Sequence, residues 1–238
     1  MMGRHIARFA VVVWGLLMLG LAVTWYTLSA EDLDALAGVQ AAALCWLVVG
    51  AILTIKVSSN LVGPLALVAG SAWVVYLFGN SYGAASLASN GSGLWGGYFF
   101  AWVGAWVGAL LPIGVTLLIL VSPSGKPVGR WSLLMVLPIA GLISTVVGAA
   151  LLWGLPLQIL ADIERVSEEG VYGFVDAGFI IGFVSAVPAA VSIVARYRRA
   201  SSIERQQVKW LMAATCLFAL VFVIAASPDD SNETAGAW

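Results

Sequence analysis

Apolar residues fill the chain in long runs, separated by short stretches that carry most of the charge. A transmembrane helix needs roughly 20 apolar residues, because each residue adds about 1.5 Å toward a hydrocarbon layer about 30 Å thick. Runs of this length predict seven transmembrane helices, at residues 9–30, 36–55, 61–79, 97–121, 131–154, 175–195 and 210–227. The pattern predicts an all-α, polytopic bundle over residues 1–226, with a polar, mobile tail at 227–238.

The first run also has features of a secretory signal peptide. It follows Arg4 and Arg8, and it ends at Leu28-Ser29-Ala30, which resembles a small-residue cleavage site. Its apolar region is longer than the roughly 7–15 residues of a signal peptide, and Leu28 is large for that site. We therefore interpret the run as a retained helix.

The composition agrees with a bilayer environment. Hydrophobic residues make up 61% of the 238 residues and charged residues only 10%, against about a quarter charged in soluble domains. A surface so poor in charge would not keep a protein of this size in solution. We therefore exclude a soluble globular domain.

The few charged residues are distributed unequally between the two predicted sides of the membrane. Basic residues concentrate in cytoplasmic loops of membrane proteins. With the N-terminus in the cytoplasm, ten of the eleven Lys and Arg residues fall inside, with Arg165 as the exception: Arg4, Arg8, Lys56, Lys126, Arg130, Arg196, Arg198, Arg199, Arg205 and Lys209. Seven crossings then place the C-terminus outside. This predicts a multi-pass membrane protein.

Two connecting segments have helical features of their own. Leu155, Ile159, Ile163 and Val166 recur at helical spacing after Pro156, which suits a first turn. They predict a short helix over residues 155–166, lying on the outer membrane surface. Before the last run, Ser201 and Glu204 have the spacing of a capping box.

Catalytic and metal-binding chemistry finds few candidate residues. Ionisable groups inside a membrane are costly and usually functional, yet none lies well inside a predicted helix. Asp176 comes nearest, at the outer start of the sixth helix, while His5 belongs to the basic N-terminal flank and Cys45 and Cys216 lie in apolar runs as small apolar side chains. We expect no enzyme activity, no catalytic or metal-binding residue and no cofactor.

Small residues recur at the spacing that allows close helix packing. Gly104 and Gly108 form one GxxxG pair, and Gly178 and Gly182 form another. Such pairs let two helix backbones approach closely. Two interpretations remain open, namely packing within the chain and a homodimer face.

A basic cluster precedes the last predicted helix. Its candidate contact residues are Arg196, Arg198, Arg199, Arg205 and Lys209. Basic residues beside a membrane hold anionic lipid headgroups at about 1 kcal/mol each. The cluster is either a topological anchor alone or a contact for anionic lipids or a cytoplasmic signalling partner; no nucleic acid is expected.

Three predicted cytoplasmic segments carry a recurring pattern. They read SNLVGPL at residues 59–65, LVSPSGKPVGRW at 120–131 and RYRRASSIERQQVKW at 196–210. Together they resemble the membrane-embedded N-terminal input region of bacterial, actinobacterial-type sensor histidine kinases, which carries Asn-Pro-Ile-Gly-Trp-Leu, Phe-Pro-Asp-Gly-Arg and a basic cluster before Glu-Arg-Gln-Gln-x-Lys-Trp. Leu61 stands where that family has proline, and Ser124 where it has aspartate. The family's phosphoacceptor and ATP-binding motifs are missing from these residues, so the resemblance does not imply kinase activity for this chain.

These observations lead to one main functional hypothesis and two alternatives. The resemblance implies a sensor-like or regulatory membrane module without its own catalytic domain, acting through membrane lipids and a membrane or cytoplasmic partner. The first alternative is a small transporter or permease-like bundle for an apolar solute. The second is a structural membrane assembly protein.

Overall fold

The fold is entirely helical in the part of the chain that the computed structural model describes. That part comprises residues 11–12, 14–24, 33–56, 61–88, 94–122, 129–160, 170, 172–198 and 209. These residues form helices and turns and no strand. The predicted all-α class, with about seven helices, is confirmed.

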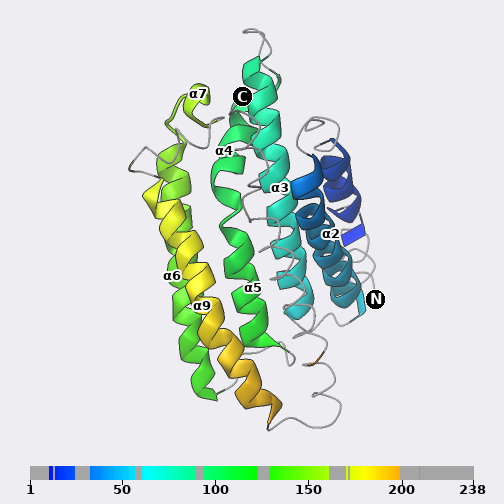
Figure 1. The fold of residues 1–238 in the computed structure, drawn as a ribbon, viewed down its shortest axis with the longest axis vertical. Coiled ribbons are helices and arrows are strands. Elements are labelled where there is room, and N and C mark those ends of the chain that lie inside the picture. Colours follow the sequence, from blue (N-terminus) through cyan, green and yellow to red (C-terminus); the bar gives the residue numbers. More distant parts are fainter. Residues whose placement is uncertain are drawn as a thin grey trace, which may run out of the picture.

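The helices follow one another up and down the long axis of the molecule (Figure 1). A first helix includes Trp14–Thr24. The elements after it are α2 (Leu33–Lys56), α3 (Val62–Ala88), α4 (Gly97–Val107), α5 (Leu110–Val121), the 3-10 helix η1 (Gly129–Met135), α6 (Val136–Leu152), α7 (Leu157–Leu160) and α9 (Gly173–Tyr197).

Several of these helices are long and apolar enough to cross a membrane. Val62–Ala88, Trp131–Leu152 and Gly173–Val194 each meet that requirement, and α4 with α5 makes a fourth if the bent pair is one span. Trp14–Thr24 and Leu44–Lys56 are shorter apolar helices. The chain is a membrane protein with transmembrane helices.

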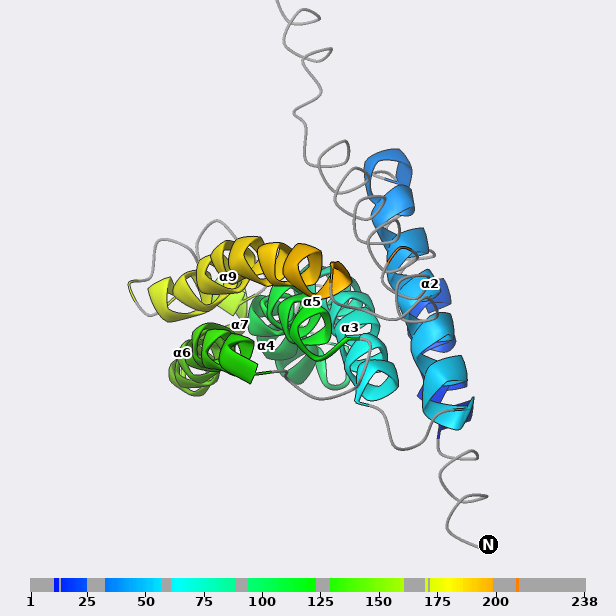
Figure 2. The same cartoon turned by 90° about the horizontal axis from the view of Figure 1, so that it is seen from below.

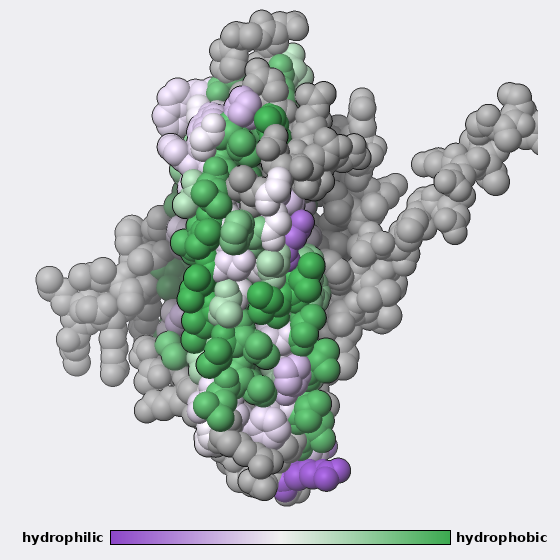
Figure 3. All heavy atoms as spheres, turned by 90° about the vertical axis from the view of Figure 1, so that its left-hand side faces the viewer, coloured by the Kyte–Doolittle hydropathy of each residue, from purple (hydrophilic) through white to green (hydrophobic). Residues whose placement is uncertain are grey.

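The outward surface of the bundle fits a lipid environment. Figure 3 shows hydrophobic side chains along much of the face made by α6 and α9, with one strongly hydrophilic patch at its lower end. Large apolar side chains such as Ile143 on α6 and Val187 on α9 are 59% and 67% exposed. In water this surface would favour aggregation, whereas hydrocarbon tails solvate it without penalty.

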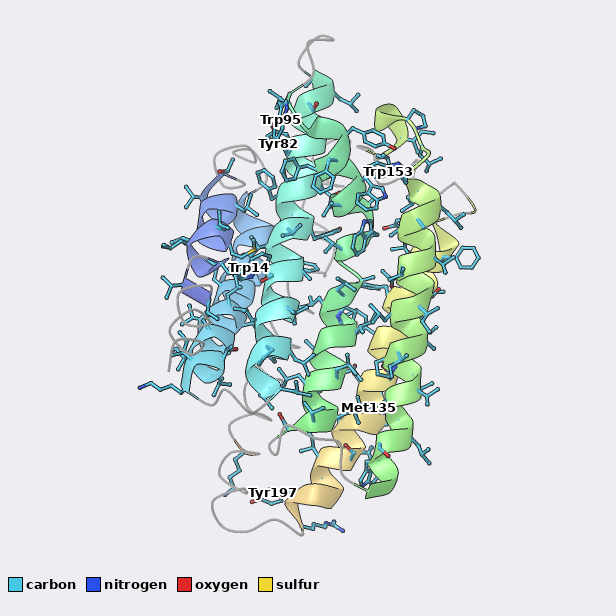
Figure 4. The ribbon with its side chains drawn as sticks, turned by 180° about the vertical axis from the view of Figure 1, so that it is seen from behind. Trp14, Tyr82, Trp95, Met135, Trp153 and Tyr197 are labelled. Atoms are coloured by element: carbon cyan, nitrogen blue, oxygen red, sulfur yellow. The ribbon has the colours of Figure 1, made fainter. Side chains whose placement is uncertain are left out.

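The two ends of the bundle differ in charge. Lys56 ends α2, Arg130 lies in η1, and Arg198 follows α9, so these basic residues share the end that we call the basic end (Figure 1). Figure 4 places Tyr82, Trp95 and Trp153 together at the opposite end, and Met135 and Tyr197 at the basic end. The alternation of helix directions thus keeps these basic residues on one side, as the charge pattern predicts.

The main core surrounds α5, which lies between α3 on one side and α6 and α9 on the other (Figure 2). Its buried side chains include Val74 and Leu77 of α3, Ile119 and Leu120 of α5, and Ile193 of α9. The first helix joins this core through Met18, and its Trp14 Nε1 donates a hydrogen bond to Ser71 Oγ at 2.8 Å. A second, smaller core joins α4, α6, α7 and α9.

Helix α3 continues nine residues beyond the apolar run predicted at 61–79. The extension is rich in small and polar residues, so hydropathy gave no signal for it. Its small residues pack against α4: a Cβ added at Gly83 would lie 2.8 Å from the Ala101 Cβ, and Ser86 Oγ accepts a hydrogen bond from the Leu94 backbone N–H at 3.1 Å. Tertiary packing therefore extends this helix past the point where its apolar pattern stops.

Other predicted segments are described in part or not at all. Within the segment predicted as a surface helix at 155–166, the described residues form the short α7, whose first turn follows Pro156. The predicted helix at 210–227, the tail at 227–238 and the Ser201–Glu204 capping box lie outside the described residues.

Candidate binding cavity at a broken helix

The run predicted as one continuous helix over residues 97–121 consists of two helices. α4 ends at Val107 and α5 begins at Leu110, and their axes differ by 46°. The prediction of a single unbroken helix is therefore wrong. Gly108 and Ala109 form the break between the two halves.

Pro112 explains where the break falls. A proline has no backbone N–H, and its ring clashes with the carbonyl four residues earlier, which here belongs to Gly108. The Gly108 carbonyl instead accepts a hydrogen bond from the Leu111 N–H at 3.1 Å, and the Trp106 carbonyl accepts one from the Ala109 N–H at 3.1 Å. These tighter turns satisfy the backbone while they redirect the chain. Pro112 itself then lies in the first turn of α5, where proline is tolerated.

A cavity of about 140 Å³ lies against this break. It is lined by residues of α3, of the α4–α5 junction and of the start of α9: Trp73, Tyr76, Ala105, Gly108, Ala109, Tyr172, Val175, Asp176 and Phe179. Discontinuous transmembrane helices frequently form binding sites, because non-helical backbone is tolerated where it lines a cavity. The position makes this cavity the candidate functional site.

The first turn of α9 brings the only charged group to the lining. Asp176 lies in that turn and is exposed, so it stands at the mouth of the cavity. Tyr172, just before the helix, is buried, and its carbonyl accepts hydrogen bonds from the N–H groups of Val175 at 2.8 Å and Asp176 at 3.0 Å. Burial, with smaller effects of Tyr76 and Asp176, raises the pKa of the Tyr172 phenol. Tyr172 therefore presents a neutral hydroxyl.

Aromatic side chains fix α4 above the cavity. Trp102 Nε1 donates to the Ala149 carbonyl at 2.7 Å, and the Tyr98 hydroxyl donates to the Trp153 carbonyl. The Trp102 and Trp153 rings meet edge to face, with centroids 4.8 Å apart. These contacts bind α4 to the end of α6 and hold the upper half of the broken span in place.

Below the cavity the span is packed with apolar side chains. Leu111, Leu118 and Ile119 of α5 are at most 2% exposed. Thr116 Oγ1 donates a buried hydrogen bond to the Gly182 carbonyl at 3.0 Å, which joins α5 to α9. The described residues therefore enclose the cavity on the side of the basic end.

The four glycines predicted as packing residues all lie at contacts between helices of this chain. A Cβ at Gly104 would lie 2.7 Å from the Asn80 backbone nitrogen, and one at Gly108 would lie 2.7 Å from the Tyr76 ring. The two glycines of α9 face different helices: Gly178 approaches Gly141 and Thr145 of α6, while Gly182 approaches Pro112 and Ile113 of α5. Each GxxxG pair thus takes part in the internal packing of the bundle.

Of the predicted basic contact residues, Arg196 and Arg198 lie at the end of α9 opposite the cavity. Arg196 lies in the last turn of α9, and Arg198 and Lys209 are exposed. Arg199 and Arg205 lie outside the described residues, as do His5 and Cys216, while Cys45 is an exposed free thiol on α2. Among the described residues, no group of His, Cys, Asp and Glu has the geometry of a metal site.

Sequence reasoning missed most of the cavity residues, although two signals pointed to them. Pro112 follows Gly108 at the spacing that kinks a helix, inside the run 97–121. Trp73 lies well inside the run 61–79, whereas amphipathic aromatic residues prefer the ends of a run. The sequence places Asp176 at the outer start of the sixth predicted helix. The pattern of that helix alone does not show that a break in another helix lies beside it.

Comparisons with known proteins identify no relative of this chain, since no family model, no curated protein and no solved structure matches it.

Proposed function

We propose that the protein is a sensor-like or regulatory membrane module, without its own catalytic domain, that receives a small molecule in the cavity at the helix break. Binding would repack α9 and change the basic end of the bundle, where anionic lipids or a signalling partner are contacted. The observation that carries this proposal is the position of the cavity. It meets the first turn of α9, and the last turn of the same helix carries Arg196.

The structure of α9 supports the transmission of a conformational change along this helix. It is one continuous helix over Gly173–Tyr197, with Pro188 inside it, and it runs from the cavity to the basic end. Its close contacts with α5 and α6 are made through glycine backbones, at Gly178 and Gly182. Helices packed in this way shift by about 1–2 Å between discrete arrangements during switching, so a ligand at one end can bias the position of the other.

The cellular setting belongs to the same proposal. We place the protein in the bacterial plasma membrane as a multi-pass protein, with the basic end in the cytoplasm, because basic residues mark cytoplasmic loops. The resemblance of residues 59–65, 120–131 and 196–210 to sensor histidine kinase input regions favours a signalling role over the alternatives. Those segments follow or precede helices at the basic end, where a partner would be met.

A distance measurement across the bundle tests the coupling. Spin labels at Leu61→Cys and Val194→Cys, on exposed positions of α3's start and α9's last turns, report movement at the basic end after Cys45→Ser and Cys216→Ser remove the native thiols. The variants are reconstituted in nanodiscs, and double electron–electron resonance spectroscopy gives the distribution of distances between the two spin labels.

Filling the cavity should act like a bound ligand. Ala105 lines it and is 4% exposed, so Ala105→Leu should shift the label distance by about 1–2 Å, whereas Ala150→Leu on the exposed face of α6 should not. If Ala105→Leu fails to fold, Gly108→Ala serves instead, because its Cβ would displace the Tyr76 ring. A folded cavity variant with the same label distance as the control would overturn the proposal.

A further inference from the structure

Four of the nine residues that line the cavity are aromatic, and one carboxylate lies at its mouth. Trp73, Tyr76, Tyr172 and Phe179 supply the rings, and Asp176 supplies the charge. Aromatic faces attract cations, and cages of such rings bind quaternary ammonium groups. We propose that this cavity binds a small organic cation of the substituted-ammonium class. The inference rests on the proposed function, since it assigns the chemical class of the molecule received at the same site.

The rings approach the cavity from two helices that are far apart in sequence. Trp73 and Tyr76 come from α3, with ring centroids 5.0 Å apart. Tyr172 and Phe179 come from the start of α9 on another side. The Gly108–Ala109 backbone closes a further side, and the missing side chain of Gly108 is what leaves room beside Tyr76. A cation in the cavity would meet ring surface in more than one direction.

The sign of the ligand charge follows from the lining. Asp176 is the only charged residue among the lining residues. The described basic residues Lys56, Arg130 and Arg198 lie at the basic end, away from the cavity. An anion would be repelled by the carboxylate and would find no basic side chain in the lining, whereas a cation would be attracted by the carboxylate and the ring faces together.

The lining favours an organic cation over a metal ion. Calcium takes six to eight oxygen ligands, and magnesium demands near-octahedral oxygen coordination, yet the lining side chains offer only the Asp176 carboxylate and two phenol oxygens. A substituted ammonium group is weakly hydrated and sheds its water more readily. The volume agrees, because about 140 Å³ is close to the roughly 150 Å³ of an engineered cavity that binds benzene.

Isothermal titration calorimetry of the full chain in phosphatidylglycerol nanodiscs tests the assignment. The probes are choline and 3,3-dimethylbutan-1-ol, which has the same shape with carbon in place of the charged nitrogen. Choline should bind, and the neutral probe should bind at least about tenfold more weakly, because it lacks the charge that rings and carboxylate attract. Equal affinity for the two probes, or no choline binding, overturns the inference.

Variants of the lining separate charge from shape. Asp176→Asn should weaken choline binding about tenfold, and Tyr172→Leu about fivefold, while Tyr172→Phe keeps the ring and should stay within about twofold. Phe174→Leu is the matched control, since it removes an exposed ring on the same turn that does not line the cavity. Unchanged affinity in Asp176→Asn overturns the inference even if the tyrosine variant misfolds.

Two further arms complete the design. Nanodiscs that contain phosphatidylcholine test whether the ammonium group comes from a lipid: weaker choline binding supports a lipid headgroup in the cavity, and unchanged binding supports a free solute. The label-distance experiment is independent of the probe. If Ala105→Leu moves the basic end but choline does not bind, the ligand class is wrong and the sensor proposal stands; if choline binds but the basic end does not respond, the proposed function is wrong.

Discussion

The two halves of the broken span, α4 and α5, are built on different principles although they belong to one apolar run. In α4, five of eleven residues are buried, and four of them are glycine or alanine: Gly97, Ala101, Gly104 and Ala105, with Val107 as the fifth. In α5, ten of twelve residues are buried, including large aliphatic side chains such as Leu111, Leu118 and Ile119. The first half packs by close approach of backbones, and the second packs by filling space.

This difference explains why the cavity lies where it does. Small residues bring α4 against α3 but leave the space beside the junction to be bounded by rings from other helices. Large aliphatic residues of α5 are instead buried in the main core, in contact with neighbouring apolar side chains. The broken span therefore consists of α4, which leaves room for a ligand beside it, and α5, which is tightly packed and resists deformation.

The largest expected effect is in the filled half. Leu118 is 1% exposed, so Leu118→Ala should lower the free energy of unfolding by about 2–5 kcal/mol, from lost apolar contacts and the void left behind. Unfolding in mixed detergent, followed by circular dichroism, measures this change. Leu133→Ala is the control, because Leu133 is 73% exposed. Similar losses in both variants would show that α5 is not the tightly filled half.

A smaller effect is expected where backbones touch. The Cβ of Gly104→Ala would lie 2.7 Å from the Asn80 nitrogen and 2.8 Å from the Gly79 carbonyl carbon. Backbone cannot move aside as a side-chain tip can, so the free energy of unfolding should fall by about 1–3 kcal/mol. In the control, Gly15→Ala, the added methyl has nothing within 4 Å, and the better helix propensity should leave stability equal or higher by up to about 1 kcal/mol.

The smallest effect concerns the hydrogen bond between α5 and α9. Thr116→Val removes the donor to the Gly182 carbonyl, and such bonds in membrane proteins contribute about 0.6 kcal/mol. The same unfolding assay measures the loss. Thr24→Val is the matched control, because the Thr24 hydroxyl donates to the Gly20 carbonyl of its own helix. A loss of several kcal/mol for Thr116→Val alone would mean that a polar contact, rather than apolar filling, dominates the stability of α5.

Hydropathy located α2 and α9 closely, because the energy of burying apolar surface in a bilayer depends on composition and length. The bounds of α2 and α9 lie within a few residues of the predicted 36–55 and 175–195. The extension of α3 to Ala88 escaped prediction, since it depends on the Ser86 hydroxyl and the Ala101 surface of another element. The local pattern of apolar and polar residues does not predict contacts between residues that are distant in the sequence.

The candidate site shows the same limit. Pro112 favours a kink at Gly108, because its effect on the preceding turn is local and steric. A proline alone does not decide the outcome, since Pro188 lies inside α9 without ending that helix. The cavity itself required knowing that the start of α9 lies beside this kink, and that Trp73 and Tyr76 face it from α3. A single sequence does not supply such pairings between helices. From the sequence, Asp176 is interpreted only as a residue at the start of a helix, whereas in the structure it lines the cavity.

Pro112 also has a consequence for the rate of binding. The bend it imposes is a property of the covalent chain, so the space at Gly108 is present before any molecule arrives. A site with a preformed shape has no slow opening step ahead of the encounter. The observed association rate should therefore rise in proportion to ligand concentration without reaching a plateau. Ligands of similar size should differ mainly in their dissociation rates.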